Sequence, residues 1–270
     1  MKYYLYNPLS NNGIRPEFKE GSNVIEVIGL NYQEFFGNLK SDDEVVLVGG
    51  DGTINYFINQ IDTDNLKNNI YIKKSGTGND FLVDLGKVDE EEVLINDYLK
   101  NLPTVEVNGM KRKFINGIGY GIDGYCCEVA DKMKETEPNK KINYTSIAIK
   151  GLLFHFKPKG ATITVDGETH EFKHVWLAPS MKGRFYGGGM MVAPNQNRLE
   201  NKLSVVVYMT RSKLKALMVF PSIFKGEHIK KEKMVKVFEG KEIEVKFDVP
   251  CALQIDGETV LNVSSYKVHL

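Results

Sequence analysis

The sequence has little cysteine and no long apolar run. Its three cysteines are two neighbours, Cys126 and Cys127, and the distant Cys251. This number and spacing match neither a disulfide framework nor a zinc site, so we expect reduced thiols in a cytoplasmic protein. The N-terminus lacks the apolar core of a signal peptide, and no uncharged apolar run reaches the roughly 18 residues of a membrane span. We therefore expect a soluble chain.

The sequence also lacks an excess of charge of either sign. Lys and Arg together number 35, as do Asp and Glu, so no overall positive field would attract nucleic acid, and we predict none as a partner. We expect the five histidines, including the pair His170 and His174, to be structural or exposed rather than ligands, and nothing indicates a catalytic triad. A hydrophobic fraction of 42% in 270 residues is typical of a globular protein with one large domain or two.

A glycine turn after a strand is the most informative stretch. Residues 45–48 are four consecutive apolar residues, which predict a strand buried on both faces, and the apolar spacing of residues 54–61 predicts a helix. Gly49, Gly50 and Gly52 lie between the two, where unpaired helix amides and the helix dipole favour an anion. The spacing fits neither a P-loop nor G-x-G-x-x-G, so a turn without a ligand is the alternative. Asp51 favours a shared cation, as in sites for Mg²⁺-nucleotide.

The rest of the first hundred residues alternates strands and helices. We predict strands at 3–6, 24–28 and 70–72, and helices at 32–39, 81–85 and 91–102. Such alternation indicates a parallel sheet that binds ligands beyond the carboxyl ends of its strands. A polar loop with Ser10 and a second glycine turn at 75–80 fall at these ends. They predict further walls of a phosphate site, although a solvated loop and a helix N-cap at Asn79 are the simpler alternatives.

After Pro103 the pattern changes to short alternating runs separated by Asn-Gly, Asp-Gly and Glu-Gly turns. This pattern predicts antiparallel strands, with one helical interlude at about 128–156. We therefore expect two domains, an α/β domain over 1–102 and a β-rich domain over 103–270, with a return of the last strands towards the first domain left open.

Three segments together resemble the catalytic domain shared by bacterial diacylglycerol kinases and sphingosine-kinase-like lipid kinases. They read GGDGTIN at 49–55, SGTGNDF at 75–81 and GGGMMVAP at 187–194. Shorter matches follow the same order: N-P-x-S at 7–10, F-x-N at 114–116 with G-I-D at 121–123, and QIDGE at 254–258. The resemblance therefore extends over nearly the whole chain.

The resemblance implies an N-terminal α/β domain with a mainly parallel, NAD-kinase-like sheet and a C-terminal antiparallel sandwich. It also implies ATP-dependent transfer of phosphate to the hydroxyl of diacylglycerol or a related lipid, with ATP and Mg²⁺ as cofactors. Glu258 is then the catalytic base, and Asp51 the second catalytic residue, acting on Mg²⁺ through water. The implied nucleotide site consists of Asn7, Ser10, Gly49, Gly50, Asp51, Gly52, Thr53, Ile54, Asn55, Thr77 and Asn79.

Two details of the sequence bear on these assignments. Asp-Gly-Glu-Thr occurs twice, at 166–169 and 256–259, and each copy is also explained as a hairpin turn; only the family order assigns the base to Glu258 rather than Glu168. In the family an acidic segment after Ala-Pro holds a structural Mg²⁺. Here residues 195–204 keep only Glu200 as a candidate metal ligand, with Lys202 nearby.

Two basic, partly apolar stretches at 150–159 and 223–233 are either solvated faces or contacts with an anionic membrane. We expect a cytoplasmic lipid kinase in transient contact with the membrane that carries its lipid substrate, and the sequence leaves a homodimer open. Two alternatives remain, an NAD kinase-like phosphotransferase and a non-catalytic nucleotide-binding paralogue.

Overall fold

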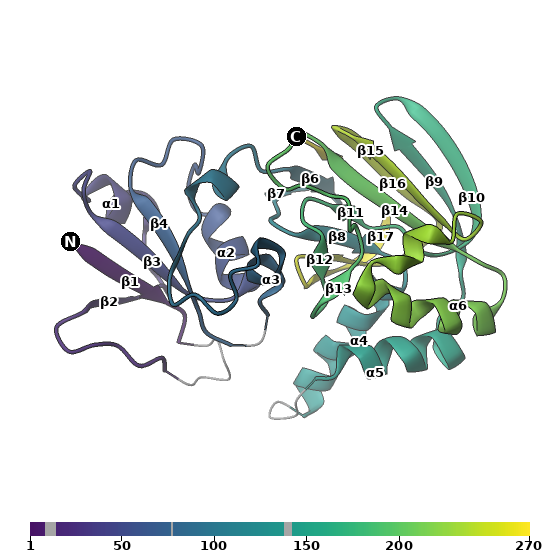
Figure 1. Ribbon diagram of the computed structural model, residues 1–270, viewed down its shortest axis with the longest axis horizontal. Coiled ribbons are helices and arrows are strands. Elements are labelled where there is room, and N and C mark those ends of the chain that lie inside the picture. Colours follow the sequence, from purple (N-terminus) through teal and green to yellow (C-terminus); the bar gives the residue numbers. More distant parts are fainter. Residues whose placement is uncertain (9–14, 77, 138–141) are drawn as a thin grey trace. The chain divides into compact units, whose positions relative to one another are not determined.

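The computed structural model describes residues 1–8, 15–76, 78–137 and 142–270. These residues form two compact units, Met1–Leu102 and Pro103–Leu270 (Figure 1). Within the described ranges, every helix is too short or too polar to span a bilayer.

The first unit contains a five-stranded sheet in the order β2-β1-β3-β4-β5. Strands β1 to β4 run parallel and only β5 is antiparallel, which confirms the predicted mainly parallel sheet. The strands are β1 (Lys2–Tyr6), β2 (Asn23–Glu26), β3 (Glu44–Gly49), β4 (Asn69–Lys74) and β5 (Val93–Leu94). The helices are α1 (Tyr32–Gly37), α2 (Asp51–Ile58), α3 (Asp80–Leu85) and the short 3-10 helix η2 (Asn96–Leu99).

The predicted helix at 91–102 is wrong. Residues of this segment alternate between buried Val93, exposed Leu94 and buried Ile95, because β5 pairs with the edge of β4. The side chain of Asn96 then accepts a hydrogen bond from the amide of Ile70 and donates one to the carbonyl of Asn68. Pairing with β4 thus satisfies an otherwise open strand edge, which a helix would leave unpaired.

The second unit contains a large antiparallel sheet in which β16 pairs with β17, β8 and β9. Because β9 continues through β10, β14, β11 and β8 back to β16, the sheet closes on itself around an apolar cluster that includes Ile118, Ile163, Val205 and Leu253. The predicted antiparallel, β-rich fold is confirmed. The strands of this sheet are β6 (Thr104–Val107), β7 (Met110–Lys113), β8 (Gly117–Tyr120), β9 (Lys159–Val165), β10 (Glu168–Leu177), β11 (Ser180–Met181), β14 (Leu203–Met209), β15 (Val235–Gly240), β16 (Glu242–Ile255) and β17 (Glu258–His269). A separate two-stranded sheet consists of β12 (Phe185–Tyr186) and β13 (Met190–Met191).

Helices cover this sheet with a second apolar cluster. They are α4 (Ile122–Thr136), α5 (Tyr144–Lys150), the π-helix η3 (Gly151–His155), α6 (Lys213–Val219) and the 3-10 helices η4 (Phe220–Lys225) and η5 (Glu227–Lys230). The predicted interlude at 128–156 begins too late, since α4 starts at Ile122, and the helices at 213–230 were missed. The signals were present: the Ser212 hydroxyl caps α6 through the amide of Lys215, and apolar residues recur at helical spacing behind it.

Candidate active site

The first glycine turn joins β3 to α2 in a space that excludes side chains. A Cβ on Gly50 would lie 2.0 Å from the carbonyl oxygen of Gly78, and one on Gly49 would lie 1.9 Å from the hydroxyl oxygen of Thr53. A Cβ on Gly52, by contrast, would meet nothing within 4 Å among the residues that the structure describes. Gly49 and Gly50 are therefore needed for packing, while the space beside Gly52 is open.

The two predicted glycine turns contact each other directly. The amide of Asp51 donates to the carbonyl of Gly78 (2.9 Å), and the amide of Ser75 donates to the carbonyl of Gly49 (2.9 Å). The carboxylate of Asp51 accepts from the amides of Asp80 (2.8 Å) and Phe81 (3.0 Å), the first residues of α3. The structure thus brings the two turns together, and Asp51 serves as the N-terminal cap of a helix that belongs to the other turn.

Asn79 presents an unsatisfied polar atom beside these turns. Its side-chain amide donates to the carbonyl of Gly76 (3.0 Å), but its Oδ1 is buried and has no hydrogen-bond partner within the described part of the chain. A Cβ on Gly50 would lie 3.6 Å from that oxygen. Because buried acceptors are normally satisfied, Asn79 Oδ1 is available to a donor group of a ligand.

The other predicted nucleotide-site residues differ in position. Asn7 follows β1 at the same carboxyl edge, since Tyr6 is paired with Val48. Ile54 and Asn55 are buried on α2, so their side chains stabilise the helix against the sheet. Thr53 lies in the first turn of α2, while Ser10 and Thr77 fall outside the described residues.

Glu258 lies at the start of β17, directly after a two-residue hairpin turn. Asp256 and Gly257 have φ values of 46° and 92°, as expected for an Asp-Gly hairpin. The side chain of Glu258 is 55% exposed and forms an ion pair with Arg112 at 2.6 Å. The Oε1 of Gln254 accepts the amide of Gly257 (2.7 Å) from inside the hairpin.

The carboxylate of Asp256 anchors this turn to the strand β8 region. It accepts from three consecutive amides, those of Ile115 (2.6 Å), Asn116 (2.9 Å) and Gly117 (3.0 Å). The hydroxyl of Thr259 donates to Asp131 of α4 at 2.6 Å. The position of Glu258 is therefore fixed from several sides.

The other Asp-Gly-Glu-Thr copy forms the same kind of hairpin between β9 and β10, which confirms that prediction. Asp166 and Gly167 have φ values of 46° and 88°, and Oδ1 of Asp166 accepts from the amides of Lys241 (2.9 Å) and Glu242 (2.8 Å). Glu168 is 78% exposed, and Nε2 of His170 lies 3.3 Å from its Oε1. This glutamate lies on an open surface.

A buried carboxyl group, which is not among the predicted site residues, lies behind the second hairpin. Asp123 in the first turn of α4 accepts a hydrogen bond from the hydroxyl of Tyr186 (3.1 Å), and burial raises the pKa of Asp123 to about 6. A Cβ on Gly119 would lie 1.7 Å from Asp123 Oδ2 and 2.7 Å from Nε2 of Gln254, so both side chains occupy the space beside this glycine. The available signal was the G-I-D triplet within the resemblance.

The segment that would hold a structural metal contains cations instead. Glu200 accepts from Asn197 (3.2 Å) and pairs with Lys202 (3.1 Å), whose hydrogen bond is the largest cause of the lowered pKa of Glu200. Buried Arg198 donates to the carbonyl of Ile115 (2.8 Å) and to Asn116 Oδ1 (2.9 Å).

Lys182 lies beside this segment and donates to the carbonyl of Glu200 (3.0 Å). Burial, with the charge of Arg198, lowers the pKa of Lys182 to about 8. Among the residues described, no group of three His, Cys, Asp or Glu side chains is placed to hold a metal ion. The residues around Glu200 therefore do not fit a structural Mg²⁺.

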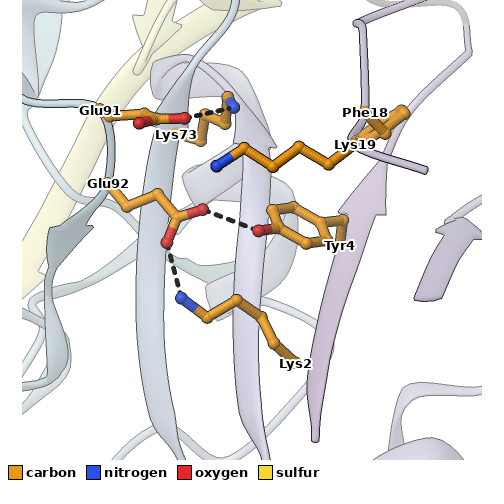
Figure 2. Close-up of a pocket in the computed structure, with 7 residues that line it drawn as sticks. All are labelled: Lys2, Tyr4, Phe18, Lys19, Lys73, Glu91 and Glu92. Atoms are coloured by element: carbon orange, nitrogen blue, oxygen red, sulfur yellow. Dashed lines mark hydrogen bonds and ion pairs between the residues drawn. The ribbon is translucent and has the colours of Figure 1, made fainter. Parts of the chain in front are cut away.

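A cavity of about 210 Å³ lies on the sheet of the first unit, away from the predicted site residues. In this cavity the carboxylate of Glu92 accepts hydrogen bonds from the ammonium group of Lys2 (2.8 Å) and the hydroxyl of Tyr4 (3.0 Å) (Figure 2). The carboxylate of Glu91 accepts one from the ammonium group of Lys73 (3.2 Å). Because these charged groups are paired within the cavity, we assign them to the stability of the sheet.

Two family profiles match the chain one after the other. Residues 20–107 match the diacylglycerol kinase catalytic domain, and residues 116–267 match the YegS C-terminal NAD kinase beta sandwich-like domain. The chain therefore belongs to the family of diacylglycerol kinase and YegS-like lipid kinases.

Individual relatives agree with this assignment. The chain is 24% identical over 247 residues to a diacylglycerol kinase of Mycobacterium tuberculosis, covering 83% of this chain and 78% of that protein. It is 23% identical over 229 residues to the diacylglycerol kinase of Bacillus subtilis, covering 82% and 72%. A crystal structure of a diacylglycerol kinase from Bacillus anthracis has the same fold, with a TM-score of 0.64, 18% identity and coverage of 99% of this chain and 93% of that one.

Proposed function

We propose that this protein transfers the terminal phosphate of ATP to the hydroxyl group of diacylglycerol or a related lipid, in the cytoplasm and in transient contact with the membrane. The proposal rests mainly on the pair of glycine turns at the carboxyl edge of the parallel sheet. Because glycine has no side chain, a ligand can approach the backbone amides of these turns closely. The names of the mycobacterial and Bacillus relatives support a lipid acceptor.

The phosphates of ATP would lie at the start of α2, beside Gly52. The helix dipole and the amides of the first turn favour negative charge there, and none of the side chains in the described ranges occupies the space next to Gly52. Asn79 Oδ1 would accept a hydrogen bond from a hydroxyl or amino group of the nucleotide. Mg²⁺ would arrive with ATP and neutralise its phosphate charge, because the Asp51 carboxylate already holds the amides of α3.

Glu258 would receive the proton of the acceptor hydroxyl as it attacks the phosphate. The carboxylate is exposed to an incoming substrate, and Arg112 fixes its direction. The anchored turn holds the carboxylate of Glu258 in one place during the reaction. The entropy of orienting this base is therefore lost on folding and not in the reaction itself. The side chain of Glu168 is 78% exposed and lies 3.3 Å from His170 instead of pairing with an arginine.

A substitution of Gly52 should change the affinity for ATP without destabilising the fold. Gly52→Ala adds a methyl group that meets no described protein atom within 4 Å, and alanine favours a helix more than glycine does, so we expect a melting temperature at or slightly above that of the wild type. If the phosphates approach the backbone here, the methyl group weakens ATP binding by about tenfold or more, roughly the 1.4 kcal/mol of one close contact. Isothermal titration calorimetry with Mg·ATP measures this difference.

Gly37→Ala is the matched control, because Gly37 also lies in a helix with nothing near its missing side chain. It should have a similarly small effect on the melting temperature and leave the ATP affinity unchanged. Equal ATP affinity of the Gly52 variant and the control would place the phosphates elsewhere.

One assay tests the activity itself. The protein is incubated with radiolabelled ATP, Mg²⁺ and separate pools of diacylglycerol, sphingoid base and NAD, and we expect label in a lipid product. Label in NADP would identify an NAD kinase-like phosphotransferase. Label in neither, despite calorimetric binding of ATP, would identify a non-catalytic paralogue, which the cation-filled segment around Glu200 makes the relevant alternative.

A further inference from the structure

Two helical segments of the second unit leave large apolar side chains in solvent. Phe154 of η3 is 71% exposed, and Leu214 and Met218 of α6 are 67% and 63% exposed. Ile149 of α5 and Leu153 of η3 are exposed to a smaller extent. We call these five residues the α5–α6 surface.

The two segments lie side by side. The ammonium group of Lys213 in α6 donates to the carbonyl of Leu153 in η3 (3.0 Å), and Figure 1 shows both segments on the same unit. Their inner residues, among them Leu152 and Ala216, share one buried cluster. Each segment thus has apolar side chains on its buried face and also on part of its solvent-exposed face. A helix that only covers a protein core is normally polar on the exposed face.

Acidic residues are missing from both segments. Residues 138–165 and 201–226 contain no aspartate or glutamate, although an even distribution of the 35 acidic residues would place about seven there. Within the described residues, none of the exposed cations on these segments forms an ion pair with a carboxylate. These cations are Lys150, Lys157, Arg211, Lys213, Lys215 and Lys225.

We propose that the α5–α6 surface docks on an anionic phospholipid bilayer, with Phe154, Leu214 and Met218 inserted among the lipids. The exposed apolar side chains complement the acyl chains of a bilayer, and the surrounding cations, which form no ion pair in the ranges that the structure describes, complement its anionic headgroups. The chain as a whole has no net charge, so this positive charge is local to the surface. The inference deepens the proposed function, on which it rests, by naming the part of the molecule that meets the lipid substrate's membrane.

Vesicle co-sedimentation tests the surface directly. The intact protein is mixed with vesicles of phosphatidylcholine alone or with about one-third phosphatidylglycerol. We expect the wild type to bind the anionic vesicles. The double variant Phe154→Ser with Leu214→Ser should bind them at least tenfold more weakly. A second double variant, Lys213→Glu with Lys215→Glu, should lose the preference for anionic over neutral vesicles. Matched controls are Leu261→Ser, which is 53% exposed on β17, and Lys236→Glu on β15; both should bind like the wild type. Equal binding of all variants would overturn the proposal.

Two further measurements keep this inference separate from the proposed function. With a short-chain diacylglycerol dispersed in water, the double variant should keep wild-type activity, whereas with diacylglycerol in bilayers it should lose most of it. If the wild-type protein binds anionic vesicles but phosphorylates neither form of diacylglycerol, the proposed function is refuted and the assignment of the α5–α6 surface as a membrane-docking surface is unaffected. A wild-type dimer that the double variant converts to a monomer in light scattering would assign the surface to self-association and overturn the membrane proposal.

Discussion

The turns at 166–169 and 256–259 have the same four residues and nearly the same backbone angles, yet their surroundings differ. Asp166 accepts hydrogen bonds from two exposed amides, whereas Asp256 accepts them from three consecutive amides at the start of β8. Glu168 faces solvent, whereas Glu258 is fixed by Arg112. Local sequence therefore determines the turn, and long-range contacts determine what the turn can be used for.

The largest expected difference concerns catalysis. Glu258→Gln removes the proposed base but keeps the size of the side chain, and should lower kcat with diacylglycerol at least about 100-fold. Glu168→Gln should leave kcat within about twofold, because its side chain is open to solvent. Steady-state kinetics of the two variants give the comparison, and similar activities would remove Glu258 from its role.

The next difference concerns stability. Asp256→Asn replaces one acceptor oxygen by a donor facing backbone amides, and should destabilise the second unit by about 2–3 kcal/mol. Asp166→Asn should cost about 1 kcal/mol or less, since its amides are exposed to water. Urea denaturation measures both, and the reverse ranking would show that Asp256 is not the anchor of its turn.

The buried carboxyl group behind the second turn gives stability a pH dependence. The pKa of Asp123 is raised from 3.8 to about 6, so its favourable contribution is present below about pH 4 and lost as the pH rises through 6. Asp123→Asn stays neutral and still accepts from Tyr186, so it should be more stable than wild type by about 1–3 kcal/mol at pH 8. The two proteins should differ little at pH 4. Melting temperatures between pH 4 and pH 8 test this, and a difference that does not vary with pH would contradict the assignment.

The threonines of the two turns provide the smallest contrast. Thr259→Val breaks a hydrogen bond to Asp131 that ties β17 to α4, and should cost about 1 kcal/mol. Thr169→Val breaks only a contact with Thr164 at an exposed hairpin, and should cost less than about 0.5 kcal/mol. Denaturation curves of the paired variants check the order; equal costs would mean that α4 does not support the second turn.

Sequence reasoning identified the features that local patterns encode. The glycine turns, the mainly parallel sheet and both Asp-Gly hairpins were predicted because strand runs and turn residues act over a few positions. The helix predicted at 91–102 was wrong because its residues respond to the open edge of β4, which lies about 20 positions earlier in the chain.

The details of the site depend on contacts that spacing does not reveal. That Asp51 caps α3 follows only when the two glycine turns are seen in contact. The same is true of Arg198, whose buried guanidinium reaches back to Ile115 and Asn116. The sequence indicated that the acidic segment was depleted, but not that cations had replaced it.

The Asp51 carboxylate has one more consequence. Because it spans both loops, a ligand that draws it away must also release the first amides of α3, including that of Phe81. The ring of Phe81 stands edge-on to Tyr98, with centroids 5.9 Å apart. Release of the Phe81 amide would therefore also change the packing around the ring of Tyr98 in η2, so occupancy of the glycine turns should be detectable in the fluorescence of this tyrosine.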